Sequence, residues 1–172
     1  MNFPIRFESE RLQALPIQPQ DWTALFEAVS SERFPSKLPL ARIKTQEQAQ
    51  CWSEERVKEW KLGTAFVWSL RLNNSTDVIG QISLIPQTSD YALAYWIHPK
   101  YWKQGFATEA CSALLQHLRI NTNNCRIWAG TQVWNMASSA VLETLGFKFQ
   151  RTVTHELVNG NNEQILEYVL AL

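Results

Sequence analysis

The sequence lacks the features that mark several classes of protein. Its lysines and arginines number 16, as do its aspartates and glutamates, so the formal net charge at pH 7 is zero. Dedicated nucleic-acid binders carry a positive excess, and we expect no such partner. No apolar run approaches the roughly 18 residues of a membrane-spanning helix. Residues 1–8 contain no apolar segment typical of a signal peptide. We therefore expect neither a membrane span nor a signal peptide.

Cysteine is scarce as well. Cys51, Cys111 and Cys125 are an odd number, and no two of them form a CxxC pair. A disulfide framework is typical of an even number of cysteines, and a zinc site is typical of CxxC pairs. The pattern favours reduced thiols in a cytoplasmic protein that holds no metal, with Cys111 as a small residue on the apolar face of a helix.

The sequence does contain enough residues for one globular domain. A chain of 172 residues is long enough for a substantial core and short for two domains. No repeat, low-complexity tract or linker divides it, so we expect residues 1–172 to form a single domain. Eight tryptophans are many for this length. They fit a lined cleft or a buried contact surface equally well, which leaves the oligomeric state open.

The apolar periodicity predicts a mixture of strands and helices. Strands are expected at 10–17, 64–72, 78–85, 91–97, 126–133, 147–157 and 164–172, and helices after Pro19, after Thr45, from Gly105 to about 119 and from 137 to 145. Asn159-Gly160 predicts a hairpin between the last two strands. This order mixes hairpins with βα crossovers, which is typical of an α+β fold with a mixed sheet and not of a doubly wound parallel sheet.

Residues 95–110 carry the strongest functional signal. They have the pattern of an apolar strand, a short turn, a loop centred on Gly105 and the first turn of a helix. Backbone N–H groups at such a junction converge on one point, with the positive end of the helix dipole behind them. This predicts an anion site, and pyrophosphate is the anion we expect. Gly105 alone would fit a tight turn equally well. The chain contains neither a Gly-Lys-Ser/Thr loop nor a three-glycine dinucleotide fingerprint.

A second signal, Asn135-Met136-Ala137-Ser138, follows about 30 residues later. Asn135 fits the N-cap of a helix that ends at Gly146. It also follows a strand, and ligand clefts often open at strand ends in sheets. Its amide would suit an extended, amide-rich ligand such as pantetheine. Both interpretations of Asn135 stand on the sequence alone.

Taken together, residues 96–110 and 135–147 resemble the GNAT superfamily of acyl-CoA-dependent N-acyltransferases. Within that superfamily the chain is most similar to the ribosomal-protein N-terminal acetyltransferase type, and Ser9-Glu10-Arg11-Leu12 and residues 78–82 agree with that type. The resemblance implies a central, mostly antiparallel, mixed sheet of seven strands flanked by about four helices. It also implies acetyl-CoA as the co-substrate.

The resemblance assigns positions to the co-substrate. The expected cofactor loop comprises Trp102, Lys103, Gln104, Gly105, Phe106, Ala107 and Thr108, and its backbone amides would bind the pyrophosphate of CoA. The strand end Tyr95, Trp96 and Ile97 would hydrogen-bond the pantetheine arm. A backbone N–H there would polarise the thioester carbonyl. Asn135 would hold the arm, and Ser138 would lie near the sulfur.

Two positions depart from the superfamily pattern. Trp102 stands where many members have Gln or Arg, three residues before the glycine. Leu142 stands where many members have a tyrosine that protonates the leaving thiolate. Ser138 is therefore the candidate for that acid.

No residue is a clear general base. Glu32 and Asp90 are more typical of solvated turn charges, and His98 before Pro99 is more typical of a structural role. An α-amine, with a pKa of about 7.7–8.0, needs roughly 1.4 kcal/mol to lose its proton at pH 7. A lysine needs about 4.6 kcal/mol. A site without a strong base therefore favours an α-amine.

These observations predict an N-acetyltransferase. We expect an acetyl group to move from acetyl-CoA to a primary amine, preferably the N-terminal α-amine of a protein or peptide. Direct attack in a ternary complex would leave no covalent enzyme intermediate. Residues 33–44 and 155–164 are expected to form the wall on the acceptor side. The alternatives are a small-molecule amine as acceptor, a non-catalytic domain that binds or senses acyl-CoA, and an interaction module built on exposed tryptophans.

Overall fold

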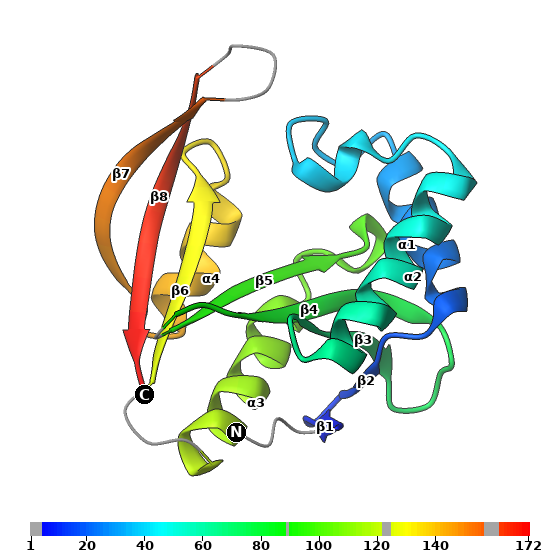
Figure 1. Ribbon diagram of the computed structural model, residues 1–172, viewed down its shortest axis with the longest axis horizontal. Coiled ribbons are helices and arrows are strands. Elements are labelled where there is room, and N and C mark those ends of the chain that lie inside the picture. The colour runs from blue at the N-terminus through cyan, green and yellow to red at the C-terminus, as the bar shows by residue number, and fades with distance from the viewer. Residues whose placement is uncertain (1–4, 89, 122–124, 157–161) are drawn as a thin grey trace.

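Every strand of the structure belongs to one sheet (Figure 1). The computed structural model describes residues 5–88, 90–121, 125–156 and 162–172. Within them, eight strands have the order β1-β2-β3-β4-β5-β6-β8-β7. The strands are β1 Phe7–Glu8, β2 Leu12–Pro16, β3 Phe66–Leu72, β4 Val78–Pro86, β5 Tyr91–Ile97, β6 Arg126–Gln132, β7 Lys148–Glu156 and β8 Asn162–Ala171. β5 and β6 are parallel and the other neighbours are antiparallel. The predicted mixed, mostly antiparallel sheet is confirmed.

The prediction of seven strands was wrong by one. The additional strand, β1, pairs antiparallel with β2, with Phe7 opposite Ala14. A strand of two residues is too short to show a period-two pattern, so only its partner reveals it. Phe7 is held in place by an edge-on contact with Trp68, their ring centroids 5.6 Å apart. Asn159-Gly160 lies outside the described residues.

Four α-helices cover the two faces of the sheet, as predicted. They are α1 Trp22–Ser30, α2 Gln46–Leu62, α3 Phe106–Asn121 and α4 Met136–Thr144. The described chain also has three short 3-10 helices, η1 Pro19–Asp21, η2 Pro39–Arg42 and η3 Pro99–Tyr101. In the part of the chain that the structure describes, no helix has both the length and the apolar character to cross a membrane.

Helix ends follow from local chemistry. Thr45 Oγ1 accepts a hydrogen bond from Gln48 N at 3.3 Å and caps the start of α2. Gly63 ends the same helix in the left-handed conformation, with a φ of 70°. At the start of α4, Asn135 Oδ1 accepts from Ser138 N at 3.3 Å. The capping role that the sequence suggests for Asn135 is therefore present.

Alternate residues of β5 divide the core into two clusters. Trp96 packs with Leu25 and Ala28 of α1. Leu93 and Ile97 belong to a larger cluster that contains the apolar residues of α3 and Leu142 of α4. Because neighbours along a strand point to opposite faces, α1 and α2 lie on one face of the sheet and α3 and α4 on the other (Figure 1).

Candidate active site

The two central strands separate after a short parallel pairing. β5 and β6 pair only at Tyr91 with Ile127 and at Ala92 with Trp128, and beyond these residues the strands diverge (Figure 1). From Leu93 onward, the edge of β5 that faces β6 has no strand partner in the described residues. Main-chain polar groups need a hydrogen-bond partner when buried, so this edge offers donors and acceptors to a ligand.

The register of β4 and β5 shows which residues face the gap. His98 N donates to Ile79 O at 2.8 Å, and the pairing runs without a shift from there back along β5. In an antiparallel pair, every second residue directs its N–H and C=O to the partner strand. Trp96 therefore bonds to β4, whereas the main chains of Tyr95 and Ile97 face the gap. Of the three residues predicted at the strand end, Tyr95 is suited to pair with pantetheine. Ile97 offers its N–H alone, because Ile97 O already accepts from Trp102 Nε1 at 2.6 Å.

The loop before α3 has the shape of an anion site. Lys103 and Gly105 adopt left-handed φ angles of 63° and 81°, and α3 begins at the next residue, Phe106. Among the described residues, the N–H groups of 103–108 donate to no protein acceptor, and Glu109 N is the first that does, to Gly105 O at 3.0 Å. Unbonded amides at a helix N-terminus attract anions.

The geometry of Gly105 is compatible with both roles that the sequence left open. Its φ of 81° is one that other residues adopt only with strain, so the turn requires a glycine. A Cβ at this position would have one neighbour within 4 Å, Arg11 Nη2 at 3.6 Å. The space beside the loop is therefore open for a ligand to approach.

Trp102 joins the loop to the end of β5. Its Nε1 donates to Ile97 O at 2.6 Å, and the guanidinium of Arg33 lies 5.6 Å from the centre of its ring. The indole N–H is therefore already bonded to the main chain. The polar group that many superfamily members carry at this position has no direct substitute in Trp102.

Two hydroxyl groups meet beside the gap. Tyr95 Oη lies 2.9 Å from Ser138 Oγ and also donates to Ser138 O at 3.3 Å. Burial of the phenol raises the pKa of Tyr95 well above its usual range, Cys111 adds to the rise, and the hydrogen bond with Ser138 opposes it. The phenol therefore stays neutral and able to donate. The resemblance had implied a role for the main chain of Tyr95 alone. Leu142 is buried and lines the cleft, so an apolar side chain stands where many superfamily members carry the tyrosine acid.

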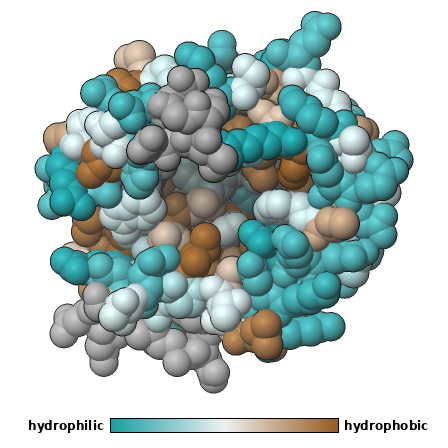
Figure 2. Space-filling view, turned by 45° about the horizontal axis from the view of Figure 1, so that its top comes forward, coloured by the Kyte–Doolittle hydropathy of each residue, from teal (hydrophilic) through white to brown (hydrophobic). Residues whose placement is uncertain are grey.

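A cleft of about 490 Å³ passes through the sheet at the gap. It is lined from the α3/α4 face by Tyr95 and Ser138 and from the α1/α2 face by Trp96, Phe34 and Leu38. Figure 2 looks into this side of the molecule and shows a hollow near the centre, with apolar side chains inside and hydrophilic ones around it. Residues 33–44, predicted as a wall on the acceptor side, contribute Phe34 and Leu38, and the predicted hairpin segment contributes residue 163.

The residues considered as general bases lie elsewhere. Glu32 is exposed and is not among the residues that line the cleft. Asp90 forms an ion pair with Arg126, 2.9 Å between Oδ2 and Nη2. His98 Nδ1 accepts from Lys100 N at 3.1 Å, and burial lowers the pKa of His98 despite a nearby carboxylate. His98 thus caps η3, the structural role that its position before proline suggested.

Two carboxylates do line the cleft, and sequence reasoning missed both. They are Glu59 on α2 and Glu163 on β8. Glu59 Oε1 accepts from Arg56 Nη2 at 2.8 Å. Gln132 Nε2 donates to Glu163 Oε1 and to Lys37 O, and so links the two walls of the cleft. No local pattern marks these residues, because each is one charge among several on its element.

Unpartnered polar atoms cluster around the same cleft. Among the described residues, Arg56 Nε, Glu59 Oε2, Thr131 Oγ1 and Gln132 Oε1 are buried without a hydrogen-bond partner, and all four residues line the cleft. A buried polar group without a partner costs about 1–3 kcal/mol. This concentration of unpaired groups suits a polar ligand in the cleft.

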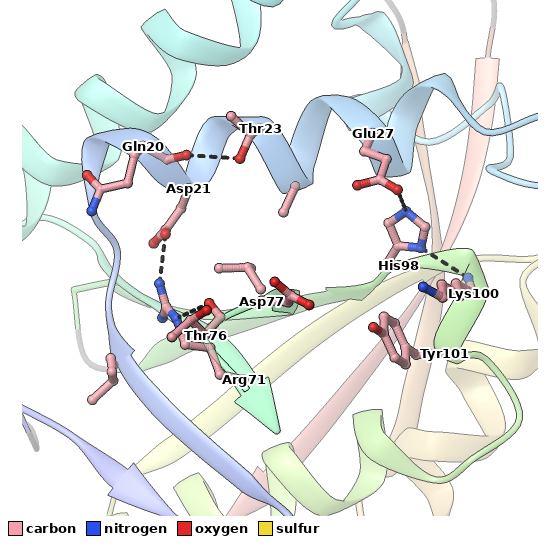
Figure 3. A pocket seen from close by; sticks show the side chains of 13 residues that line it. Gln20, Asp21, Thr23, Glu27, Arg71, Thr76, Asp77, His98, Lys100 and Tyr101 are labelled. Carbon is pink, nitrogen blue, oxygen red and sulfur yellow. Dashed lines mark hydrogen bonds and ion pairs between the residues drawn. The ribbon is translucent and has the colours of Figure 1, made fainter. Parts of the chain in front are cut away.

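A second pocket, of about 570 Å³, lies between α1 and the sheet (Figure 3). Asp21 Oδ1 accepts from Arg71 Nη2 at 2.8 Å on one side of it, and His98 lies near Glu27 on the other. The Asp21 carboxylate also accepts from Ser69 Oγ at 2.6 Å. The pocket is lined by neither Tyr95 nor residues 103–108. It is therefore separate from the strand gap.

The fold and the cleft define an N-acyltransferase of the GNAT class. The chain belongs to the GNAT acetyltransferase family, because residues 11–148 match the family described as "Acetyltransferase (GNAT) domain". It is therefore an acyltransferase. YoaA of Bacillus subtilis strain 168, named an uncharacterized N-acetyltransferase, is 26% identical over 149 residues, 85% of this chain and 84% of that protein.

Solved structures share the whole fold. The ribosomal L7/L12 alpha-N-protein acetyltransferase RimL, in complex with coenzyme A, has a TM-score of 0.83 at 19% identity, covering 99% of this chain and 97% of that one. The microcin C7 self-immunity acetyltransferase MccE, in complex with acetyl-CoA and AMP, has a TM-score of 0.83 at 16% identity, covering 95% of this chain and 93% of that one. At these identities the likeness establishes the fold.

Proposed function

We propose that the protein transfers an acetyl group from acetyl-CoA to a primary amine, and that its favoured acceptor is the N-terminal α-amine of a protein or peptide. The cleft that crosses the sheet between β5 and β6 carries this proposal. A thioester held from the α3/α4 face and an amine arriving from the α1/α2 face would meet in the gap. Such an arrangement supports direct attack in a ternary complex, because both reactants are oriented before they react.

The residues of the α3/α4 side suit each part of the donor. The acetyl thioester supplies an activated carbonyl and a thiolate leaving group. The free amides of 103–108 would bind the pyrophosphate, and the main chain of Tyr95 would hydrogen-bond the pantetheine arm. Its N–H would stabilise negative charge on the carbonyl oxygen. Asn135 Nδ2 remains available for the arm, since Oδ1 is engaged with Ser138 N. Ser138 Oγ would donate to the leaving sulfur.

Glu163 is the group that we propose to receive the amine proton. It lines the cleft, and its Oε1 is held by Gln132 Nε2. A carboxylate is a weak base, so it suits an amine that needs little help. An α-amine with a pKa of about 7.7–8.0 loses its proton far more readily than a lysine. A polypeptide N-terminus therefore fits this cleft better than an internal lysine. RimL, an α-N-protein acetyltransferase, has the same fold.

Calorimetry with acetyl-CoA is the first test, because no transfer is possible without donor binding. The second test measures CoA release with peptides, polyamines and amino-sugar antibiotics as acceptors. A peptide with a free α-amine should be acetylated faster near neutral pH than its N-terminally blocked counterpart with an internal lysine. Faster turnover of the lysine peptide would contradict the proposed acceptor while leaving the transferase intact.

The alternative functions separate in the same experiments. A domain that only binds or senses acyl-CoA would bind the donor and acetylate none of the acceptors. A small-molecule acetyltransferase would prefer a polyamine or an amino sugar. A module that binds partners through exposed tryptophans would bind no acetyl-CoA. A cytoplasmic location stays a prediction from the cysteine pattern.

A further inference from the structure

We propose that Arg11 is a positioning residue for the cofactor loop, fixing the direction in which the loop's amide groups point. This inference rests on the proposed binding of CoA at residues 103–108. Arg11 stands immediately before β2, far from the loop in sequence. The structure nevertheless brings its guanidinium to the loop and to the first turn of α3.

One side chain contacts three parts of the site. Arg11 Nη2 donates to Gln104 O at 3.0 Å, and Nε donates to Glu109 Oε2 at 2.7 Å. The guanidinium carbon lies 4.4 Å from the centre of the Phe106 ring. The main-chain N–H of Arg11 also donates to Glu109 Oε1 at 2.8 Å. A planar guanidinium with several donors in fixed directions is suited to hold such a set of groups, and an ammonium is not.

The bond to Gln104 O determines which way the next amide faces. The peptide unit that joins Gln104 and Gly105 is planar and trans, so its C=O and N–H point in opposite directions. Because Arg11 holds the carbonyl, the Gly105 N–H points away from Arg11. Glycine offers little resistance to a rotation of this peptide unit. Without Arg11, the loop would therefore have a second orientation in which a carbonyl oxygen replaces the N–H.

Arg11 also neutralises a charge that would repel the donor. Glu109 lies in the first turn of α3, where a negative charge is favourable for the helix. A pyrophosphate at the same helix end would be repelled by a bare carboxylate. The hydrogen bonds from Ser9 Oγ and from Arg11 compensate that charge. Removal of Arg11 would therefore both release the loop and expose Glu109.

The test is the affinity of CoA, measured by calorimetry on the wild type, Arg11→Lys and Arg11→Ala. We expect Arg11→Ala to raise the Kd by about tenfold, equivalent to about 1.4 kcal/mol. Arg11→Lys should give an intermediate Kd, because lysine keeps the charge but cannot hold both groups in the same geometry. Adding Glu109→Gln to Arg11→Ala should recover part of the affinity. At saturating acetyl-CoA, the kcat of each variant should stay within about threefold of the wild type, since the loop is ordered by the donor.

Arg126→Ala provides a matched control. Arg126 is also an exposed arginine with two hydrogen bonds to one carboxylate, that of Asp90, and among the described residues none of its side-chain hydrogen bonds or ion pairs reaches the loop or α3. It should leave the Kd of CoA within about twofold of the wild type. Equal affinities for Arg11→Ala and the wild type would overturn the inference, as would an equal loss in the control. If the wild type itself binds no CoA, the proposed function fails, and the inference fails with it.

Discussion

The paired hydroxyls of Tyr95 and Ser138 give the sharpest prediction about catalysis. Ser138→Ala removes the group that we expect to donate to the leaving sulfur. Loss of one preorganised donor to a developing charge lowers kcat by about 10²–10³. Tyr95→Phe keeps Ser138 but removes the phenol 2.9 Å from its Oγ. One such hydrogen bond between neutral groups contributes about 0.5–1.5 kcal/mol, so kcat should fall about 2–13-fold.

The losses in kcat caused by the two substitutions should not multiply in the double variant. If Tyr95 acts by orienting Ser138, the double variant will be about as slow as Ser138→Ala alone. Steady-state kinetics with a peptide acceptor measure this, and the KM for acetyl-CoA should change by less than about threefold. Ser139→Ala is the control, because Ser139 Oγ has no partner among the described residues and its side chain does not line the cleft. Multiplicative losses in the double variant, or an unchanged kcat in Ser138→Ala, would refute the reasoning.

Four further substitutions, at three positions, test the loop, the pH dependence of stability and the sheet. Gly105→Ala forces a side chain into a φ of 81° and should weaken CoA binding in calorimetry. Gly105→Glu should abolish CoA binding through charge and bulk. Normal binding by Gly105→Glu would show that the loop is not part of the site. Burial would raise the pKa of Glu109, but hydrogen bonds from Ser9 and Arg11 outweigh it, so the pKa is lowered. The stabilisation from Glu109 is therefore present above its unfolded pKa of about 4.3 and is lost as the pH falls through the lowered folded value. Urea unfolding between pH 3 and 6 should show that the wild type's excess in free energy of unfolding over Glu109→Gln shrinks as the pH falls. A difference that stays constant with pH would contradict this. Gly80→Ala would place a Cβ 2.4 Å from Trp96 O. It should lower the free energy of unfolding by about 1–3 kcal/mol, which thermal unfolding would show as a lower melting temperature. An unchanged melting temperature would mean that β5 shifts freely.

Most elements of the fold were predictable because their signals are local. β5, for example, is an apolar run ended by His98-Pro99, and the structure ends it at Ile97. The helical spacing after Gly105 likewise matches α3. β1 was missed because two residues carry no period. Its existence depends on the edge of β2, which lies outside the reach of any local pattern.

The candidate site divides in the same way. The loop around Gly105 and the cap at Asn135 were named from sequence, since backbone conformation and helix ends have residue signatures. The contact of the Tyr95 phenol with Ser138 was missed, because the two residues are 43 positions apart. The carboxylates of Glu59 and Glu163 were missed for a similar reason. They reach one cleft only because α2 and β8 flank the same gap.

The sequence by itself determined every strand but β1, the four α-helices, the turn at Gly105 and, through its resemblance, the family to which the comparisons assign the chain. These depend on side-chain periodicity and on backbone preferences that act over a few residues. Only the tertiary structure decided that β5 and β6 part after two pairs, that Arg11 reaches the loop, and that two hydroxyls meet beside the gap. Contacts between distant segments depend on how whole elements pack, and no short stretch of sequence encodes that packing.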